Sequence, residues 1–191
     1  MQFRATELAG VVIVEPDVHR DARGYFLETY HAGKYGAGGI RAPFVQDNQS
    51  CSSRNTIRGL HMQLRKPQGK LVRVLAGEIW DVAVDVRASS PTFGRWVATV
   101  LSSDNFSQLY IPEGCAHGFC VLSQNALIEY KCTALYDPGD EVGIAYDDGT
   151  LAIPWPTNEP TLSNRDQRNP TLAEFLERVS LTKEVALARP D

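Results

Sequence analysis

The chain has 191 residues, of which 43% are hydrophobic, and a formal net charge of −4. This length suits a single domain, and the apolar share is sufficient for a folded core. The acidic balance disfavours nucleic acid as a partner, and no apolar run approaches the roughly 18 residues of a membrane span. Residues 1–10 do not resemble a signal peptide. The four cysteines form no CxxC pair, which predicts reduced thiols in a cytoplasmic protein.

Short runs rich in β-branched and aromatic residues recur between glycines and prolines over the first 140 positions. In chain order they predict strands at 11–16, 24–30, 44–50, 56–63, 70–77, 78–87, 95–102, 108–112, 117–123 and 126–136. Residues 31–39 give only a weak helix signal because they include several glycines. Many short strands with few helices are typical of a β-sandwich or barrel.

One short helix is expected near the C-terminus. Pro170 stands at its start, and Thr171 and Glu174 have the spacing of a capping box. Apolar residues then recur at helical spacing, at Leu172, Phe175, Leu176 and Val179. Residues 180–191 are expected to form a loose tail of one domain that spans 1–191.

Polar residues stand within or beside the predicted apolar strands, where packing alone would not place them. They are Arg23, Glu28, Gln46, Asn48, Arg58, His61, Gln63, Lys70, His117, Tyr130 and Glu141. Because alternate residues of a closed sheet face inward, each of them either faces solvent or lines a pocket. Because the list combines cationic side chains with amides and two histidines, it favours a pocket over a solvent-exposed face.

The histidine pattern disfavours a transition-metal site. The position two after His61 is Gln63, and His117 is the only later histidine. Two histidines without a third soft or imidazole ligand make a poor site for a transition metal. The sequence also lacks a G-x-S-x-G nucleophile elbow and a glycine-rich phosphate loop.

Proton transfer is the chemistry that remains. A neutral histidine is a base near neutral pH, and a carboxylate that accepts its second N–H holds the useful tautomer. A tyrosine can act as an acid on the far side of a substrate, and a lysine can stabilise an enolate. His61, Asp166, Tyr130 and Lys70 could fill these roles, although spacing alone does not bring them together.

Seven stretches, taken together and in order, resemble the dTDP-4-dehydrorhamnose 3,5-epimerase family. They are DARGYFLETY (21–30), VQDNQSCS (45–52), RGLHMQ (58–63), GKLVRVLAGEIWDVAVDVRASSPTFG (69–94), IPEGCAHGFCVLS (111–123), EYKCTALYDPGDE (129–141) and LSNRDQ (162–167). The resemblance implies a mainly β, cupin-like jelly roll, usually homodimeric, without a metal or organic cofactor. It also implies inversion of C3 and C5 of dTDP-4-keto-6-deoxy-D-glucose, which gives dTDP-4-keto-L-rhamnose.

Carried over position by position, the resemblance assigns four catalytic roles. His61 is similar to the family's proton acceptor, Asp166 to its orienting partner and Tyr130 to its proton donor, while Lys70, with His117, would steady the C4 oxygen. The positions that would bind the substrate are Arg23, Phe26, Glu28, Gln46, Asp47, Asn48, Arg58, His117, Tyr136, Glu141 and Arg165. Tyr136 would stack on thymine, and Arg165 stands where the family commonly has lysine.

Two geometric expectations accompany these assignments. On a regular strand, Tyr130 and Tyr136 would face the same way about 20 Å apart, a separation that suits the two ends of a nucleotide sugar. The strand at 11–16 could pair with a second copy across a two-fold axis.

Several functions remain open from the sequence. An enzyme that inverts only C3 or only C5 would share the same residues. A module that merely binds a nucleotide sugar is disfavoured by the presence of His61, Tyr130 and Asp166. A metal-dependent cupin oxygenase is disfavoured by Gln63.

Overall fold

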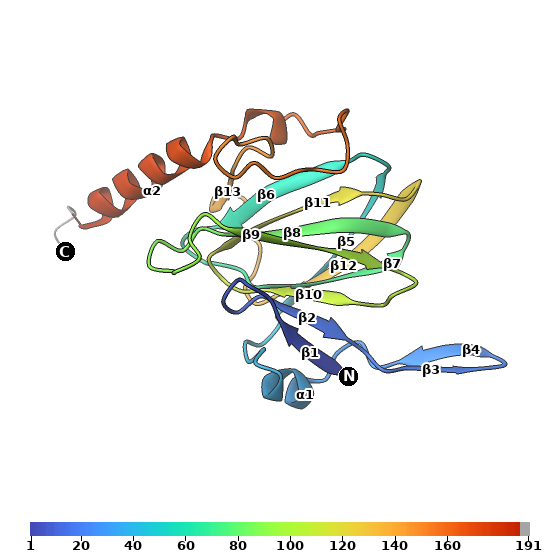
Figure 1. Cartoon of the computed structure of the whole chain (residues 1–191). Helices are drawn as coiled ribbons and strands as arrows, with labels where there is room; N and C mark the ends of the chain where they lie inside the picture. The colour runs from blue at the N-terminus through green and yellow to red at the C-terminus, as the bar shows by residue number, and fades with distance from the viewer. Residues whose placement is uncertain (188–191) are drawn as a thin grey trace.

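A computed structural model describes residues 1–187 of the protein, with side chains described through residue 180. Most of its strands form two antiparallel sheets that face each other (Figure 1). The first sheet has the order β1 (Gln2–Ala5), β2 (Val12–Glu15), β10 (Gln108–Ile111), β7 (Lys70–Ala76), β12 (Asn125–Cys132) and β5 (Gln46–Ser53). The second has the order β13 (Glu141–Gly143), β6 (Ile57–Gln63), β11 (Cys115–Val121), β8 (Glu78–Asp85) and β9 (Trp96–Ser102). This arrangement confirms the predicted mainly β jelly roll.

The remaining elements lie around this sandwich. β3 (Val18–Asp21) and β4 (Gly24–Leu27) form a separate two-stranded hairpin that projects away from the sheets (Figure 1). A short helix, α1 (Ala32–Ala37), follows it. A 3₁₀ turn, η1 (Asp166–Arg168), precedes the C-terminal helix α2 (Leu172–Leu187).

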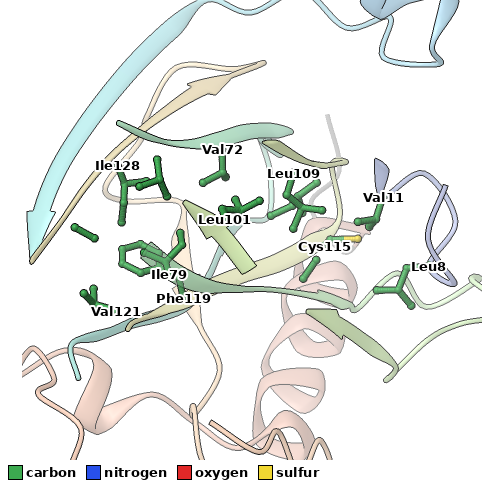
Figure 2. Packing of buried hydrophobic residues seen from close by; sticks show 14 residues of the cluster. Leu8, Val11, Val72, Ile79, Leu101, Leu109, Cys115, Phe119, Val121 and Ile128 are labelled. Carbon is green, nitrogen blue, oxygen red and sulfur yellow. The ribbon is translucent and has the colours of Figure 1, made fainter. Parts of the chain in front are cut away.

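The main core lies between the two sheets (Figure 2). Val72 and Ile128 from the first sheet pack with Ile79, Phe119 and Leu101 from the second. The alternation of β8 explains its double burial. Ile79 and Ala83 face this core, whereas Val82 and Val84 face a second apolar cluster that includes Phe175 of α2. Both faces of β8 are therefore buried, the inner face against the other sheet and the outer face against the second cluster.

Two glycines allow β6 and β11 to approach closely. A Cβ atom on Gly59, whose φ is +132°, would lie 2.5 Å from the Cα of Gly118. A Cβ atom on Gly118 would lie 2.9 Å from the carbonyl oxygen of Arg58. This contact accompanies a register shift between β6 and β11, next to the cross-strand pair of His61 and His117. The glycines of RGLH and HGF thus help to bring the two histidines side by side.

The predicted strands need several corrections. The run 126–136 is too long, because β12 ends at Cys132 and the chain then turns. The run 24–30 forms β4 only to Leu27, and it pairs with β3 outside the large sheets. The short strands β1, β3 and β13 were not predicted. The capping box is confirmed, since Glu174 accepts hydrogen bonds from the backbone N–H and the hydroxyl of Thr171.

Two further expectations also change. The strand expected to pair across a two-fold axis, β2, is already paired on both sides by β1 and β10, so β1 and β5 are the edges of this sheet. α2 continues to Leu187 through most of the segment predicted as a loose tail, and residues 188–191 lie outside the described part.

All four cysteines are free thiols, and only Cys51 is exposed. Within residues 1–187, no helix is long and apolar enough to cross a membrane.

Candidate active site

A cleft of about 710 Å³ opens between the two sheets. β5 and β6 form much of its wall, β11 contributes His117 and Phe119, and single residues of β7, β12 and β13 reach into it. The segment 161–166, just before α2, closes another side. Eleven of the residues selected from the sequence line this cleft: Gln46, Asn48, Arg58, His61, Lys70, His117, Tyr130, Tyr136, Glu141, Arg165 and Asp166.

The first feature of the cleft is a histidine–carboxylate pair. His61 Nε2 lies 2.5 Å from Asp166 Oδ1, which joins residues 105 positions apart in the sequence. The side chain of Asp166 is almost fully buried, whereas that of His61 is 23% exposed. Burial alone would raise the pKa of Asp166, but the hydrogen bond and charge of His61, together with Ser163 and Arg165, hold it below its ordinary value. Asp166 therefore stays ionised and fixes the orientation of the His61 ring.

Lys70 begins β7, and its ammonium group makes neither a hydrogen bond nor an ion pair within the described residues. Its burial lowers the pKa of the ammonium group, while Cys132, Glu141 and Asp81 act in the opposite direction. An ammonium group without a protein acceptor at a cleft wall is available to a ligand oxygen. Lys70 can thus stabilise negative charge that develops on a substrate.

Tyr130 lies on β12, opposite Val72 of β7 and Asn48 of β5. Burial raises the pKa of its phenol, and Cys132 and Glu141 raise it further. The phenol is consequently protonated over a wide pH range and can act as an acid rather than as a base. Because Tyr130 comes from the first sheet and His61 from the second, the two groups reach the cleft from different sheets.

A second histidine–carboxylate pair lies beside the first. His117 of β11 is the cross-strand neighbour of His61, and its Nε2 lies 2.7 Å from Oδ1 of Asp81 on β8. Asp81 has no exposed side-chain area. Sequence reasoning selected His117 but missed Asp81. The available signal was the alternation of β8, which puts Asp81 on the same face as the apolar Ile79 and Ala83.

Alternate residues of β5 give the cleft a polar wall. Gln46 donates from Nε2 to Asn48 Oδ1 at 2.8 Å, and Asn48 contacts Cys132 Sγ at 3.5 Å. Further along the strand, Ser52 accepts a 2.9 Å hydrogen bond from Arg58 Nε. The sequence analysis did not select Ser50 and Ser52, which follow the same alternation as Gln46 and Asn48. This wall offers amide, hydroxyl and guanidinium groups to a polar ligand.

Three charged or phenolic side chains form another part of the cleft. Arg165 pairs with the Glu141 carboxylate and also donates from Nη2 to the Glu141 carbonyl at 2.9 Å. The phenol of Tyr136 donates to Glu141 Oε2 at 3.0 Å, and its backbone N–H donates to Gln46 Oε1. The expected placement of Tyr136 on a regular strand with Tyr130 is wrong, because β12 ends before it. Both tyrosines nevertheless line the same cleft.

Gln63, at the position that argued against a metal, does not line the cleft. Its amide nitrogen donates to the carbonyls of Lys66 and Leu135, and its oxygen accepts from the backbone N–H of Asp137. The side chain is buried and holds these loop segments together. Within the part of the chain that is described, no three His, Cys, Asp or Glu side chains group as metal ligands.

Four selected residues do not line the cleft. Arg23 and Phe26 lie at the projecting β3–β4 hairpin, and Glu28 follows it and pairs with Lys34 at 2.8 Å. Asp47 lies on the other face of β5, where it pairs with Lys131 at 3.0 Å. The alternation of β5 explains the position of Asp47. The isolation of the hairpin from both large sheets explains the other three.

Comparisons with known proteins agree with this geometry. A family model described as dTDP-4-dehydrorhamnose 3,5-epimerase matches residues 5–174. A dTDP-4-dehydrorhamnose 3,5-epimerase of Shigella flexneri is 50% identical over 168 residues, covering 87% of this chain and 93% of that one. A dTDP-4-dehydrorhamnose 3-epimerase of Streptomyces niveus is 40% identical over 177 residues, covering 91% and 85%.

The fold has a solved counterpart. A crystal structure of a dTDP-6-deoxy-D-glucose-3,5-epimerase from Legionella pneumophila, in complex with dTDP-4-keto-L-rhamnose, superposes with a TM-score of 0.87. The two sequences are 47% identical, and the match covers 90% of this chain and 93% of that one. Together with the extent of the family match, these relationships show that the protein belongs to the dTDP-4-dehydrorhamnose 3,5-epimerase family.

Proposed function

We propose that the protein inverts C3 and C5 of dTDP-4-keto-6-deoxy-D-glucose and so forms dTDP-4-keto-L-rhamnose. The observation that carries this proposal is the meeting of the His61–Asp166 pair, Lys70 and Tyr130 in one cleft. The family membership and the names of the relatives support the same reaction.

The first step is proton removal from a carbon beside the ketone. The C4 carbonyl acidifies the hydrogens on C3 and C5, because the electron pair of the broken C–H bond can move onto the carbonyl oxygen as an enolate. Neutral His61 takes the proton, and Asp166 stabilises the imidazolium that forms. Lys70 and His117 donate hydrogen bonds to the enolate oxygen.

The second step returns a proton to the opposite face. Tyr130 donates its phenolic proton to the same carbon, the C–H bond re-forms and the electron pair leaves the enolate oxygen. The carbon is thereby inverted, and exchange with water restores Tyr130 and His61. A ring flip or small shift then presents the second carbon to the same groups. All of these steps are proton transfers, so the proposed reaction requires no metal or organic cofactor.

The rest of the cleft would hold the nucleotide. Arg58 and Arg165 have the planar guanidinium forks that match diphosphate oxygens. Gln46, Asn48 and Glu141 would bind polar groups of the substrate, and the ring of Tyr136 would stack on thymine. Arg165 retains the positive charge of the lysine that is common at this position.

A homodimer would give the hairpin residues a role in this site. Arg23, Phe26 and Glu28 do not reach the cleft of their own chain, and Phe26 is 70% exposed at the projecting hairpin. An exposed aromatic residue on such an arm is suited to a contact with a second copy. We therefore propose that the hairpin completes the cleft of the partner subunit. The free thiols are in keeping with a cytoplasmic location.

A single-site epimerase is the alternative. The observation in its favour is the similarity to the Streptomyces niveus 3-epimerase, which is 40% identical over most of the chain. Its reaction would need the same base, acid and enolate stabiliser, so the residues named above would keep their roles. Only the number of carbons presented to them would differ.

Incubation with dTDP-4-keto-6-deoxy-D-glucose in D₂O separates these functions. The proposed reaction predicts deuterium at both C3 and C5 of the product, together with inverted configuration at both carbons by NMR. Deuterium and inversion at one carbon would identify a single-site enzyme. Unchanged substrate in the presence of folded protein would overturn the proposed function.

A further inference from the structure

Asp81 is an unusual residue behind the cleft wall, where it contacts the cleft-lining His117. It lies on β8 in the interior of the sandwich and has no exposed area. Its Oδ1 contacts His117 Nε2 at 2.7 Å, whereas its Oδ2 is buried without a hydrogen-bond partner within the described residues. A buried carboxylate with one unsatisfied oxygen costs free energy, since it loses water without full compensation.

The apolar surroundings make this cost conspicuous. Asp81 shares a face of β8 with Ile79 and Ala83, which both belong to the main core. An apolar side chain at this position would pack without a desolvation penalty. Since buried polar groups in native structures are almost always hydrogen-bonded, the free oxygen of this carboxylate calls for an explanation, and a catalytic role is one.

The groups that face Asp81 are cationic or able to become so. His117 contacts it directly from β11, and the negative charge of Asp81 opposes the loss of the proton from Lys70 on β7. Within the described residues, the His117 ring makes no hydrogen bond other than the one to Asp81. Because Nε2 is occupied, Nδ1 is the ring nitrogen that remains for a ligand in the cleft.

We propose that Asp81 is a positioning residue of the epimerase reaction: it accepts the Nε2–H of His117, so that Nδ1 faces the substrate, and it balances the charge of an imidazolium that donates from Nδ1 to the enolate oxygen. This inference rests on the proposed function. It gives the cleft two histidine–carboxylate pairs with different tasks. Asp166 supports His61 as a base, whereas Asp81 supports His117 as a hydrogen-bond donor.

The Asp81→Asn substitution tests this role while preserving the size of the side chain. It removes the charge that stabilises the His117 donor, so deuterium exchange at C3 and C5 should fall by roughly 10- to 100-fold, less than the loss of a whole oxyanion donor. The dissociation constant for dTDP should change by less than about threefold, because the nucleotide end of the cleft is untouched. A parallel loss of dTDP binding and exchange would indicate a structural role and overturn the inference.

Asp148→Asn is the matched control. Asp148 is also buried, but its carboxylate accepts from the backbone N–H groups of Thr150, Leu151 and Leu172 outside the cleft. At a temperature where both variants are folded, as judged by circular dichroism, Asp148→Asn should exchange deuterium at the rate of the unmodified protein. An equal loss in both variants would show that removal of any buried carboxylate suffices, and would contradict the proposal.

A double-mutant cycle with His117→Asn adds a readout that a general packing defect would not produce. If Asp81 acts through His117, Asp81→Asn should lower exchange by less than about threefold once His117 is replaced. Equal factors in the two backgrounds would show that Asp81 acts independently. If the unmodified protein exchanges neither carbon, the proposed function itself fails. If it exchanges both and Asp81→Asn does so equally well, only this inference fails.

The unmodified protein provides a test that needs no substituted carboxylate. In ¹⁵N-histidine-labelled protein, the His117 signals, assigned with the His117→Asn variant, should show a protonated Nε2 in a strong hydrogen bond. A proton on Nδ1 with an unprotonated Nε2 would contradict the assigned tautomer. This measurement decides the matter even if Asp81→Asn does not fold.

Discussion

At the scale of single residues, the proposed chemistry depends on groups whose surroundings set their proton affinity. Burial raises the pKa of Tyr130 and lowers that of Lys70 in the same cleft. The phenol therefore keeps its proton at alkaline pH, whereas the ammonium group loses its proton earlier than an exposed lysine would. The two residues should consequently be distinguishable by pH.

The rate of deuterium exchange should fall as the pH rises through the pKa of Lys70. Since this pKa lies below the ordinary value of 10.5, the midpoint of the alkaline limb should also lie below 10.5. In Lys70→Arg, the guanidinium stays charged, so the fall in exchange rate should no longer occur below pH 10.5. The rate itself should be lower than in the unmodified protein. An unchanged limb in Lys70→Arg would show that another group titrates.

Tyr130→Phe should separate proton removal from inversion. Without the phenol, His61 can still remove a proton and return a deuteron to the same face, so deuterium enters with retention. Formation of inverted product should fall by roughly 10²- to 10⁴-fold, the usual contribution of a general acid. Exchange should fall less, as measured by NMR.

Tyr146→Phe provides the control for this substitution. Tyr146 does not line the cleft, and its hydroxyl makes no hydrogen bond within the described residues. Its loss should change neither rate. If Tyr130→Phe slowed exchange and inversion equally, a separate acid on the far face would be excluded.

The sequence identified residues that line the cleft, but it did not identify the residue that supports one of them from behind. His61, Lys70 and Tyr130 stand out because they interrupt apolar strands in recognisable motifs. Asp81 also interrupts a strand, but on the face opposite to the more conspicuous Trp80 and Val82. Its significance depends on a partner 36 positions away, which spacing alone does not reveal.

At the scale of elements, the end of β8 is held by one buried carboxylate. Asp85 accepts from the backbone N–H and guanidinium of Arg87, and from the hydroxyls of Ser90 and Thr92. Burial would raise its pKa, but these hydrogen bonds together hold it far below the ordinary 3.8. The network fixes the loop between β8 and β9.

Asp85→Asn should lower the free energy of unfolding by roughly 3 kcal/mol, because it leaves the Arg87 charge and buried hydroxyls without their acceptor. The sign of the pH dependence follows from the lowered pKa. The contribution of Asp85 is complete well above pH 3.8 and is lost as the pH falls towards its folded pKa. The difference between the two proteins should therefore shrink below about pH 4.

Urea unfolding at several pH values measures this difference. Asp104→Asn is the control, because Asp104 is exposed and its carboxylate makes no hydrogen bond within the described residues. Its free energy of unfolding should stay within about 0.5 kcal/mol of the unmodified value. A difference for Asp85→Asn that grew at low pH would contradict the assigned cause.

Element prediction was most successful where local chemistry decides the structure. The Thr171–Glu174 capping box acts within a few residues and is confirmed. The end of β12 was missed, because its following turn is held by contacts with Gln46 and Gln63 from distant parts of the chain. The run 24–30 was predicted as one strand among those of the sandwich or barrel, but β4 pairs only with β3, and nothing in GYFLETY tells which sheet a strand joins.

At the scale of the whole molecule, one cleft is built from both sheets and from the segment before α2. The family resemblance implied a jelly roll, and this fold brings residues of β5, β6 and β12 from separate parts of the sequence to one cleft. The sequence could not show that Arg23 and Phe26 lie away from it, because their position depends on the course of the whole N-terminal arm. In the proposed dimer, Arg23 and Phe26 lie far from the cleft of their own chain because they belong to the cleft of the partner subunit.

Subunit mixing tests this arrangement. If each hairpin completes the partner's cleft, a mixed dimer of His61→Asn and Arg23→Ala chains contains one cleft with both an intact His61 and an intact Arg23. Mixing two weakly active variants after reversible dissociation should therefore restore up to half the activity of the unmodified dimer in those mixed dimers. Activity no higher than the average of the separate variants would contradict a shared site.

The base His61 is central to the proposed reaction, and His61→Asn tests it most directly. The measurement is deuterium incorporation at C3 and C5 of dTDP-4-keto-6-deoxy-D-glucose in D₂O, with dTDP binding as the control for an intact cleft. If His61 is the base at both carbons, exchange at C3 and at C5 is lost together while dTDP still binds. Exchange at either carbon near the rate of the unmodified protein would contradict this role of His61.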